Sequence, residues 1–451
     1  MKKQMLKKSL ALIISIMLIL SIIPLGTFTV SAENYQDGNY TYSLKNSEAT
    51  ITDYNGSGGD ITIPSTLGGY PVSSIGVDAF RRCSSLTSVT IPDSVTSIGG
   101  YAFYECSSLT SITIPDSVTS IGECAFRGCS SLTSITIPES VTIIGDFTFC
   151  GCKSLSTITI PDSVTNIGEY AFCSCSSLAS VTIPNGVTTI GSRAFSECIG
   201  LTSVTIPDSV TNIDGCAFEG CSRLASIIIP DSVSSIEYGV FGGCKSLTSI
   251  TIPNSVTRIA DDAFAGCSGL TNINFGNGVT SIGYYAFNVC SGLTSITIPN
   301  SVTIIIDGAF AGCTGLTSVN LGNGVTSIGN YAFEGCSSLT SITIPESVTR
   351  IDDNVFDACS KLTIYCYENS YAHNYAIQKN IKYELMKKLI GDPSGDGVID
   401  ANDLTYFRKA LLSGEKSFDE RLDVTGDGKF DLTDLVRIKK YLADNTVPLG
   451  K

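Results

Sequence analysis

Two acidic segments near the C-terminal end carry the residues with the clearest chemistry. Residues 392–403 and 423–434 align without a gap, and each has oxygen-bearing side chains at positions 1, 3, 5, 9 and 12 and glycine at position 6. Position 7 contributes only a backbone carbonyl. Carboxylates this close repel one another without a cation, and hard oxygen donors favour Ca²⁺. The spacing therefore predicts two calcium ions, one bound by Asp392, Ser394, Asp396, Val398, Asp400 and Asp403, the other by Asp423, Thr425, Asp427, Lys429, Asp431 and Asp434.

This spacing is that of the EF-hand loop, with two departures. Position 12 is Asp rather than Glu, and position 3 is Ser394 or Thr425, which are weaker ligands than the usual Asn or Asp. An acidic turn before a helix is the alternative for a single loop, but two loops in register disfavour it. An apolar pattern at helical spacing follows each loop and predicts a helix there, at Leu404, Phe407 and Leu411 and at Leu435, Ile438 and Leu442.

Residues 391–451 resemble a type I dockerin, a small all-α calcium-binding module that docks on cohesins of a scaffoldin in cellulosome-like assemblies. The resemblance rests on the duplicated loop and helix and on the Gly-Asp opening. It implies that loop positions 10 and 11 and basic helix residues bind the cohesin, here Ala401, Asn402, Leu432, Thr433, Arg408, Lys409, Lys439 and Lys440. The Ser-Thr pair frequent at positions 10 and 11 in the family is absent, so the resemblance does not identify the cohesin.

The elements before this tail form one long repeat of 23 residues. Phe recurs in a fixed register, followed three residues later by Cys, at Phe80, Phe103, Phe126, Phe149, Phe172, Phe195, Phe218, Phe241, Phe264, Phe287, Phe310, Phe333 and Phe356. In each unit, as over 86–91, apolar and hydroxyl-bearing residues alternate with the period of a short strand. Pro92 then ends the strand, because proline has no N–H. The sequence predicts a solenoid of 13 coils with parallel strands on one face.

The repeat resembles the leucine-rich repeats of the BspA-like bacterial surface proteins. Residues 61–365 follow the pattern Leu-x-x-Ile-x-Ile-Pro-x-x-Val-x-x-Ile-x-x-x-Ala-Phe-x-x-Cys almost letter for letter. The resemblance implies an α/β-type leucine-rich repeat solenoid at the cell surface that serves adhesion or protein binding. Because a solenoid must cover its ends, we expect an N-terminal cap at 33–60 and a C-terminal cap with a short linker at 366–390.

The outward strand positions of the repeat carry Ser and Thr in most coils, and the position after the proline carries Asp, Glu or Asn. This surface is either a polar ligand face or a means of solubility and turn capping, and the second interpretation is favoured.

The repeat also places one cysteine in the same slot of all 13 coils. Side chains in one slot point the same way, which strains a bridge between neighbours, so we expect a buried ladder of thiols rather than disulfides. Cys150 and Cys173 occupy a second slot one repeat apart and are the pair best placed to form a disulfide, a question the sequence leaves open.

The first 32 residues have the layout of a secretory signal peptide. Four lysines precede an apolar stretch, and Val30-Ser31-Ala32 forms a small-residue cleavage pattern. An uncleaved membrane anchor is the alternative. No later segment reaches the ~20 apolar residues of a spanning helix, so the mature chain should be secreted without a membrane span.

Composition and motifs give no sign of an enzyme. The chain has 28 Lys+Arg against 42 Asp+Glu, a net charge of −14 that argues against nucleic acid as a partner. Its single histidine, His373, excludes multi-histidine zinc sites and falls in the expected C-terminal cap, where an exposed polar role is favoured over catalysis. Adjacent acids such as Asp352 and Asp353 could in principle cleave glycosides, but nothing in the pattern encloses them.

These features together predict a secreted, non-catalytic binding protein. The solenoid would bind a protein or glycan, and the dockerin would tether it to a scaffoldin cohesin in a polysaccharide-degrading complex. The alternatives are a carbohydrate-active enzyme or enzyme inhibitor of the same complex, or a free host-directed adhesin.

Overall fold

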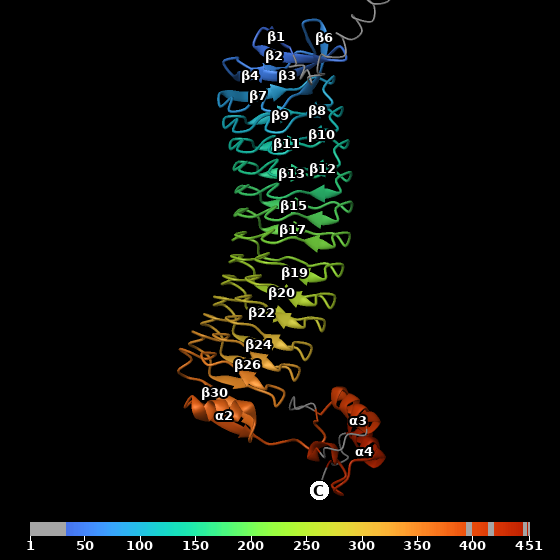
Figure 1. Ribbon diagram of the computed structural model, residues 1–451, viewed down its shortest axis with the longest axis vertical. Helices are drawn as coiled ribbons and strands as arrows, with labels where there is room; N and C mark the ends of the chain where they lie inside the picture. Colours follow the sequence, from blue (N-terminus) through green and yellow to red (C-terminus); the bar gives the residue numbers. More distant parts are fainter. Residues whose placement is uncertain (1–32, 394–398, 414–418, 445–448, 450–451) are drawn as a thin grey trace, which may run out of the picture.

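The computed structural model describes residues 33–393, 399–413, 419–444 and 449. The predicted signal peptide, residues 1–32, lies outside this part of the chain. The coils stack into an elongated, gently curved body, and two further helices lie beside its C-terminal end (Figure 1). In the described part of the chain, no helix combines the length and the apolarity needed to cross a membrane.

The first row of parallel strands carries the outward Ser and Thr residues. Its register is maintained coil by coil, so that Ser88 lies opposite Ser111 and Thr90 opposite Thr113. The row consists of β4 (Gly59–Thr62), β7 (Leu86–Thr90), β9 (Ser111–Thr113), β11 (Ser134–Thr136), β13 (Thr157–Thr159), β15 (Ser180–Thr182), β17 (Ser203–Thr205), a single bridge at Ser226, β20 (Ser249–Thr251), β22 (Asn272–Asn274), β24 (Ser295–Thr297), β26 (Ser318–Asn320), β28 (Ser341–Thr343), β30 (Thr363–Tyr367) and β31 (Lys382–Met386).

A second row of parallel strands lies on the return path of the coils. Except for the first, these strands are only two residues long, and turns rather than helices fill the rest of each return. The row consists of β6 (Tyr70–Ile75), β8 (Ser97–Ile98), β10 (Ser120–Ile121), β12 (Ile143–Ile144), β14 (Asn166–Ile167), β16 (Thr189–Ile190), β18 (Asn212–Ile213), β19 (Ser235–Ile236), β21 (Arg258–Ile259), β23 (Ser281–Ile282), β25 (Ile304–Ile305), β27 (Ser327–Ile328) and β29 (Arg350–Ile351).

Both ends of the solenoid are closed by elements that pair with the coils. At the N-terminal end β1 (Asn34–Asp37), β2 (Tyr40–Lys45) and β3 (Glu48–Tyr54) form an antiparallel meander, β3 pairs with β6, and the short β5 (Thr66–Leu67) pairs with β6 as well. At the other end helix α2 (Tyr371–Gln378) lies between β30 and β31. The predicted parallel solenoid is confirmed, with about 15 turns rather than 13, because β4 and β31 extend the first row beyond the repeats.

A column of stacked phenylalanine rings forms the centre of the core. From Phe80 to Phe333 the repeat phenylalanines are fully buried, and successive centroids lie 4.9–5.9 Å apart. Tyr54 of β3 covers one end of the column at 5.1 Å, and Tyr375 of α2 covers the other at 6.1 Å. Offset stacking contributes beyond simple burial, and the tyrosines supply the partners that the terminal rings would otherwise lack.

The repeat cysteines form the predicted ladder of buried thiols. Each Sγ from Cys106 onward donates to the carbonyl oxygen of the phenylalanine in the preceding coil, for example Cys106 to Phe80 at 3.0 Å. All 18 cysteines are free. Cys150 and Cys173 are only half buried. The neighbouring Cys150 thiol lowers the pKa of Cys173 to about 6 against the opposing effect of burial, and the Ser174 hydroxyl, 3.6 Å from the Cys173 Sγ, acts in the same direction as Cys150.

The C-terminal module has a small core of its own. Helices α3 (Ala401–Ser413) and α4 (Leu432–Ala443) contact each other, and the 3-10 helix η1 (Glu420–Leu422) precedes the second loop. Phe407, Leu422, Val424 and Ile438 are buried together. The apolar positions predicted for two helices after the two loops therefore do form a helix pair.

Candidate calcium-binding and partner-binding site

The second acidic loop is closed by hydrogen bonds to its first carboxylate, Asp423. This side chain accepts the N–H groups of Gly426 at 2.7 Å, Asp427 at 3.0 Å and Gly428 at 2.7 Å. Both glycines have φ values of 73° and 82°, which glycine adopts without strain. Burial raises the pKa of Asp423, but the hydrogen bonds from these amides outweigh burial and lower it below its ordinary value. The carboxyl group is therefore ionised at neutral pH.

The last carboxylate of the same loop, Asp434, is fully buried. Its Oδ1 accepts the N–H and the hydroxyl of Thr425, both at 3.0 Å, and its Oδ2 accepts the N–H of Asp431 at 2.9 Å. Asp431 in turn accepts the N–H of Thr433 at 2.7 Å and completes a capping box at the start of α4. One carboxylate thus fixes the loop at its third and ninth positions.

The first loop repeats this arrangement where the structure describes it. Asp403 is fully buried, and its Oδ2 accepts the N–H of Asp400 at 2.7 Å, as Asp434 does with Asp431. Asp392 is buried as well. The other predicted ligands of this loop lie outside the described residues: Ser394, Asp396 and Val398.

Burial distinguishes these loops from the other acidic residues of the chain. Among the described residues, the buried Asp and Glu side chains are Asp392, Asp403, Asp423 and Asp434. They are positions 1 and 12 of the two loops. Buried carboxylates require hydrogen bonds, an opposite charge or a metal ion. The donor set of carboxylates, a hydroxyl and a backbone carbonyl is the hard-oxygen chemistry that calcium prefers.

The side chains of the second loop are not gathered around a single point. Over its described residues, the chain has no group of three or more Asp, Glu, His or Cys side chains placed to hold a metal ion. The carboxylates of Asp427 and Asp431 instead accept the N–H groups of Lys429 at 2.9 Å and Thr433 at 2.7 Å. The residues fit calcium in type and order, and these two carboxylates would have to turn toward the ion.

The residues expected to contact a cohesin lie on exposed parts of α3 and α4. Those whose side chains are described are all exposed: Ala401, Arg408, Lys409, Leu432, Thr433, Lys439 and Lys440. For Asn402 only the backbone position in the first turn of α3 is described. The two loops thus present equivalent helix starts and equivalent basic pairs to solvent.

The helices also expose apolar side chains that the sequence interpretation missed. Tyr406 and Leu412 of α3 are 45 % and 88 % exposed, and Leu432 and Val436 of α4 are 68 % and 51 % exposed. Leu432 belongs to the partner-binding residues that the dockerin resemblance implies, whereas the other three do not. The sequence could have identified them, because these apolar residues fall outside the apolar stripe with which each helix packs against the other.

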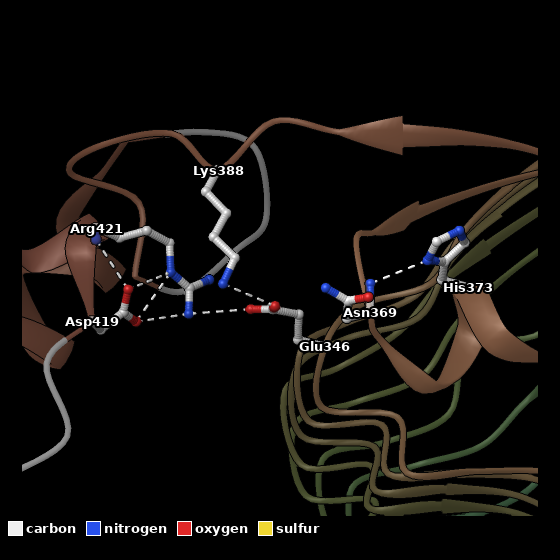
Figure 2. A network of polar contacts seen from close by, with 6 residues as sticks. All are labelled: Glu346, Asn369, His373, Lys388, Asp419 and Arg421. Carbon is white, nitrogen blue, oxygen red and sulfur yellow. Dashed lines mark hydrogen bonds and ion pairs between the residues drawn. The ribbon is translucent and has the colours of Figure 1, made fainter.

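The C-terminal module is joined to the solenoid by ion pairs as well as by the chain (Figure 2). Glu346, at the turn after β28, lies 3.1 Å from Nζ of Lys388 and 3.4 Å from Nη2 of Arg421. Arg421 also binds Asp419 at 2.8 Å, and only 13 % of its side chain is exposed. These contacts hold the start of the second acidic loop near the turn after β28.

His373 and Asp353 both form contacts with the C-terminal cap of the solenoid. His373 is partly buried rather than exposed, because its ring packs edge-on against that of Tyr383 with the centroids 4.7 Å apart. Its Nδ1 accepts the N–H of Asn369 at 3.1 Å at the start of α2 (Figure 2). Asp353 binds Nζ of Lys379 at 2.8 Å.

Comparisons with known proteins agree with both parts of the architecture. Residues 54–179, 166–294 and 235–363 match the BspA type leucine rich repeat region, with six copies, and residues 390–443 match the dockerin type I domain. No curated protein matches this chain.

Several solved structures are similar to the solenoid. A leucine rich cell surface protein from Faecalibacterium prausnitzii is 34 % identical over 77 % of this chain and 98 % of its own, with a TM-score of 0.47. A leucine-rich repeat protein from Bacteroides ovatus is 26 % identical over 78 % of this chain and 100 % of its own, with a TM-score of 0.46. The pneumococcal vaccine antigen PcpA is 20 % identical over 79 % of this chain and 99 % of its own, and its TM-score of 0.56 indicates a shared fold.

The match to the BspA type leucine rich repeat region covers more than half of the chain. The match to the dockerin type I domain coincides with the helix pair and its two acidic loops. Dockerin type I domains bind calcium and have cohesins as partners. The chain therefore belongs to the BspA-type leucine-rich repeat family and carries a C-terminal dockerin type I domain.

Proposed function

We propose that this protein is a secreted, non-catalytic binding protein of a polysaccharide-degrading complex. Its solenoid is the arm that binds a protein or glycan, and its dockerin docks on a cohesin of a scaffoldin. The observation that carries the proposal is the burial of four carboxylates at positions 1 and 12 of two loops, because these are the first and last ligand positions of an EF-hand-type calcium loop. Leucine-rich repeats and dockerins are non-enzymatic modules, typically found outside the cell or on its surface.

The dockerin binds two calcium ions in this proposal. In each loop the carboxylates at positions 1, 5, 9 and 12, the hydroxyl at position 3 and the carbonyl at position 7 are the ligands, the last supplied by Val398 or Lys429. Calcium supplies charge that offsets the repulsion among these carboxylates. Asp423 and Asp434 already hold the second loop in shape through its amides.

The cohesin is bound by the exposed starts and basic residues of α3 and α4. Because the two loop–helix units are equivalent, either could face the partner. The exposed apolar residues of the same helices, Leu432 and Val436 among them, would supply a buried centre to such an interface, with the lysines at its rim.

Calorimetry of the full chain with Ca²⁺, followed by capture on a panel of immobilised cohesins with and without EDTA, tests this function. We expect calorimetry to show two calcium sites. We also expect at least one cohesin to capture the protein and to release it when EDTA removes the calcium. Calcium binding without capture by any cohesin would favour a free adhesin. Release of reducing sugar by the chain would instead favour a carbohydrate-active enzyme.

A further inference from the structure

Two coils depart from the repeat together, in the strands β22 and β26 that flank β24. Residues 272–278 read Asn-Ile-Asn-Phe-Gly-Asn-Gly, and residues 318–324 read Ser-Val-Asn-Leu-Gly-Asn-Gly, whereas the regular coil at 111–117 reads Ser-Ile-Thr-Ile-Pro-Asp-Ser. Thr is thus replaced by Asn274 and Asn320, and the strand-ending proline by Gly276 and Gly322. The same departures in two coils around one unchanged coil point to a local feature rather than to random drift.

The departing coils enclose a recess of about 650 Å³, whose lining includes Asn274, Phe275, Asn277, Thr297, Asn300 and Asn320. None of its lining residues is charged. The corresponding recess beside β13 and β15 is smaller, about 330 Å³, and its lining includes Asp162. The substitutions therefore coincide with a recess that is larger than the one beside β13 and β15. Its lining has no charged residue, although the chain has 42 acidic residues.

Gly276 and Gly322 explain part of the larger volume of this recess. A Cβ atom at Gly276 would lie 2.5 Å from the carbonyl oxygen of Pro253, and one at Gly322 would lie 2.5 Å from the carbonyl carbon of Pro299. No other residue fits so close to the preceding coil. The backbone lies against that coil, and the proline ring that other coils place at this position is absent.

The position after the proline is also neutral in this region. It is asparagine in consecutive coils, at Asn254, Asn277, Asn300 and Asn323. The Oδ1 of Asn254 accepts the N–H of Asn277 at 2.9 Å, and the Oδ1 of Asn300 accepts the N–H of Asn323 at 2.8 Å. In these two pairs the side-chain oxygen is used within the protein, so the amide N–H₂ group of Asn300 is the part that can face a ligand in the recess.

The chemistry of this lining matches an uncharged sugar. Each sugar hydroxyl donates and accepts, and so do the amides of Asn274 and Asn320 and the hydroxyl of Thr297. The half-buried ring of Phe275 offers an apolar surface for the C–H face of a sugar. Anionic sugars would meet no cation in the recess, and cationic peptides would meet no acid.

We propose that the recess between β22 and β26 binds an uncharged oligosaccharide through Asn274, Thr297 and Asn320. The inference deepens the proposed function, because it rests on the solenoid being the ligand-binding arm. It places glycan recognition in one neutral segment of the solenoid rather than along the whole Ser/Thr face.

The test uses the full chain and hexasaccharides of β-1,4-linked glucose, xylose and mannose, with hexagalacturonate as the charged comparison, in calorimetry and saturation-transfer NMR. The double variant Asn274→Thr/Asn320→Thr restores the residue that most coils carry, so it should fold. The matched control, Thr159→Asn/Thr205→Asn, makes the reverse change at the same spacing where the prolines and Asp162 remain.

At least one neutral hexasaccharide should bind, and the double variant should weaken its binding at least tenfold while the control leaves it unchanged. The inference is wrong if no neutral hexasaccharide binds at millimolar concentration, if the double variant binds as the natural chain does, or if hexagalacturonate binds better. Cohesin capture by the same preparations separates this failure from failure of the proposed function.

Discussion

The ion pairs of Glu346 should control how the dockerin is held against the solenoid. Glu346→Gln preserves the shape of the side chain but removes its charge from both Lys388 and Arg421. Exposed ion pairs contribute ~0.2–1 kcal/mol each. Because the side chain of Arg421 is only 13 % exposed and that of Glu346 31 %, we expect the upper part of that range for each pair, about 1–2 kcal/mol together.

A loss of this size lowers the ratio of chains whose dockerin lies against the solenoid to chains whose dockerin is detached from it by a factor of about 5–30. Small-angle X-ray scattering of the full chain, with the calcium concentration held constant, detects this change as an increase in the maximum dimension of the protein. At low salt the variant should resemble the natural chain in 1 M NaCl, where screening acts over ~3 Å. Glu139→Gln is the matched control, since Glu139 follows a repeat proline just as Glu346 does.

Identical scattering of Glu346→Gln and the natural chain at low salt would refute this reasoning. So would a natural chain whose scattering does not change with salt, because the contact would then rest on something other than charge. A change of equal size in Glu139→Gln would show that the variant acts through the solenoid rather than through the junction.

Three further predictions concern the calcium loops, the thiols and the core. By calorimetry, Asp434→Asn should lower the calcium affinity of one of the two sites at least tenfold, whereas Glu420→Gln should leave both affinities unchanged. Equal effects of the two variants would contradict the assigned ligands. Because its pKa is about 6, Cys173 should be alkylated by iodoacetamide at pH 7 well before the buried ladder thiols, and it should react more slowly at pH 5. Mass spectrometry of the labelled peptides measures this, and equal labelling of all the thiols would contradict it. Phe218→Ala should lower the free energy of unfolding in urea by ~3–5 kcal/mol, and Ile228→Thr, at an 80 % exposed position, by less than ~0.5 kcal/mol; similar midpoints would contradict the stacked core.

The repeat made the solenoid predictable in unusual detail. A single register holds from Phe80 to Phe356, so each apolar position could be compared with its equivalents in the other coils. The inward residues and the buried thiols follow from that pattern, and the structure confirms them. The strands end two residues before the proline, and β22 and β26, which have glycine in its place, end at the same position in the coil. The sequence could not show that the Sγ of each thiol donates to a phenylalanine carbonyl, since this contact joins two coils.

The remainder depends on contacts between distant parts of the chain. Glu346 and Arg421 belong to different modules, and no periodic pattern relates them. The additional turns arise because β4 pairs with β7 before the first repeat phenylalanine, and because β31 pairs with β30 although its sequence departs from the repeat. The partly buried state of His373 depends likewise on β31, which brings the ring of Tyr383 against it.

The solenoid surface is less uniform than its repeat suggests, and this bears on how it recognises a ligand. Near the N-terminal end the guanidinium of Arg127 lies 4.8 Å from the ring centroid of Phe147 and 5.9 Å from that of Tyr104, which gives one edge a cationic and aromatic character. Farther along, the segment around Asn274 and Asn320 is neutral and recessed. The cationic and aromatic edge lies in the turns between the two strand rows, whereas the neutral recess lies on the first strand row. A ligand that ran along the strands would therefore meet only the second of these surfaces, which favours separate sites over a single extended ligand.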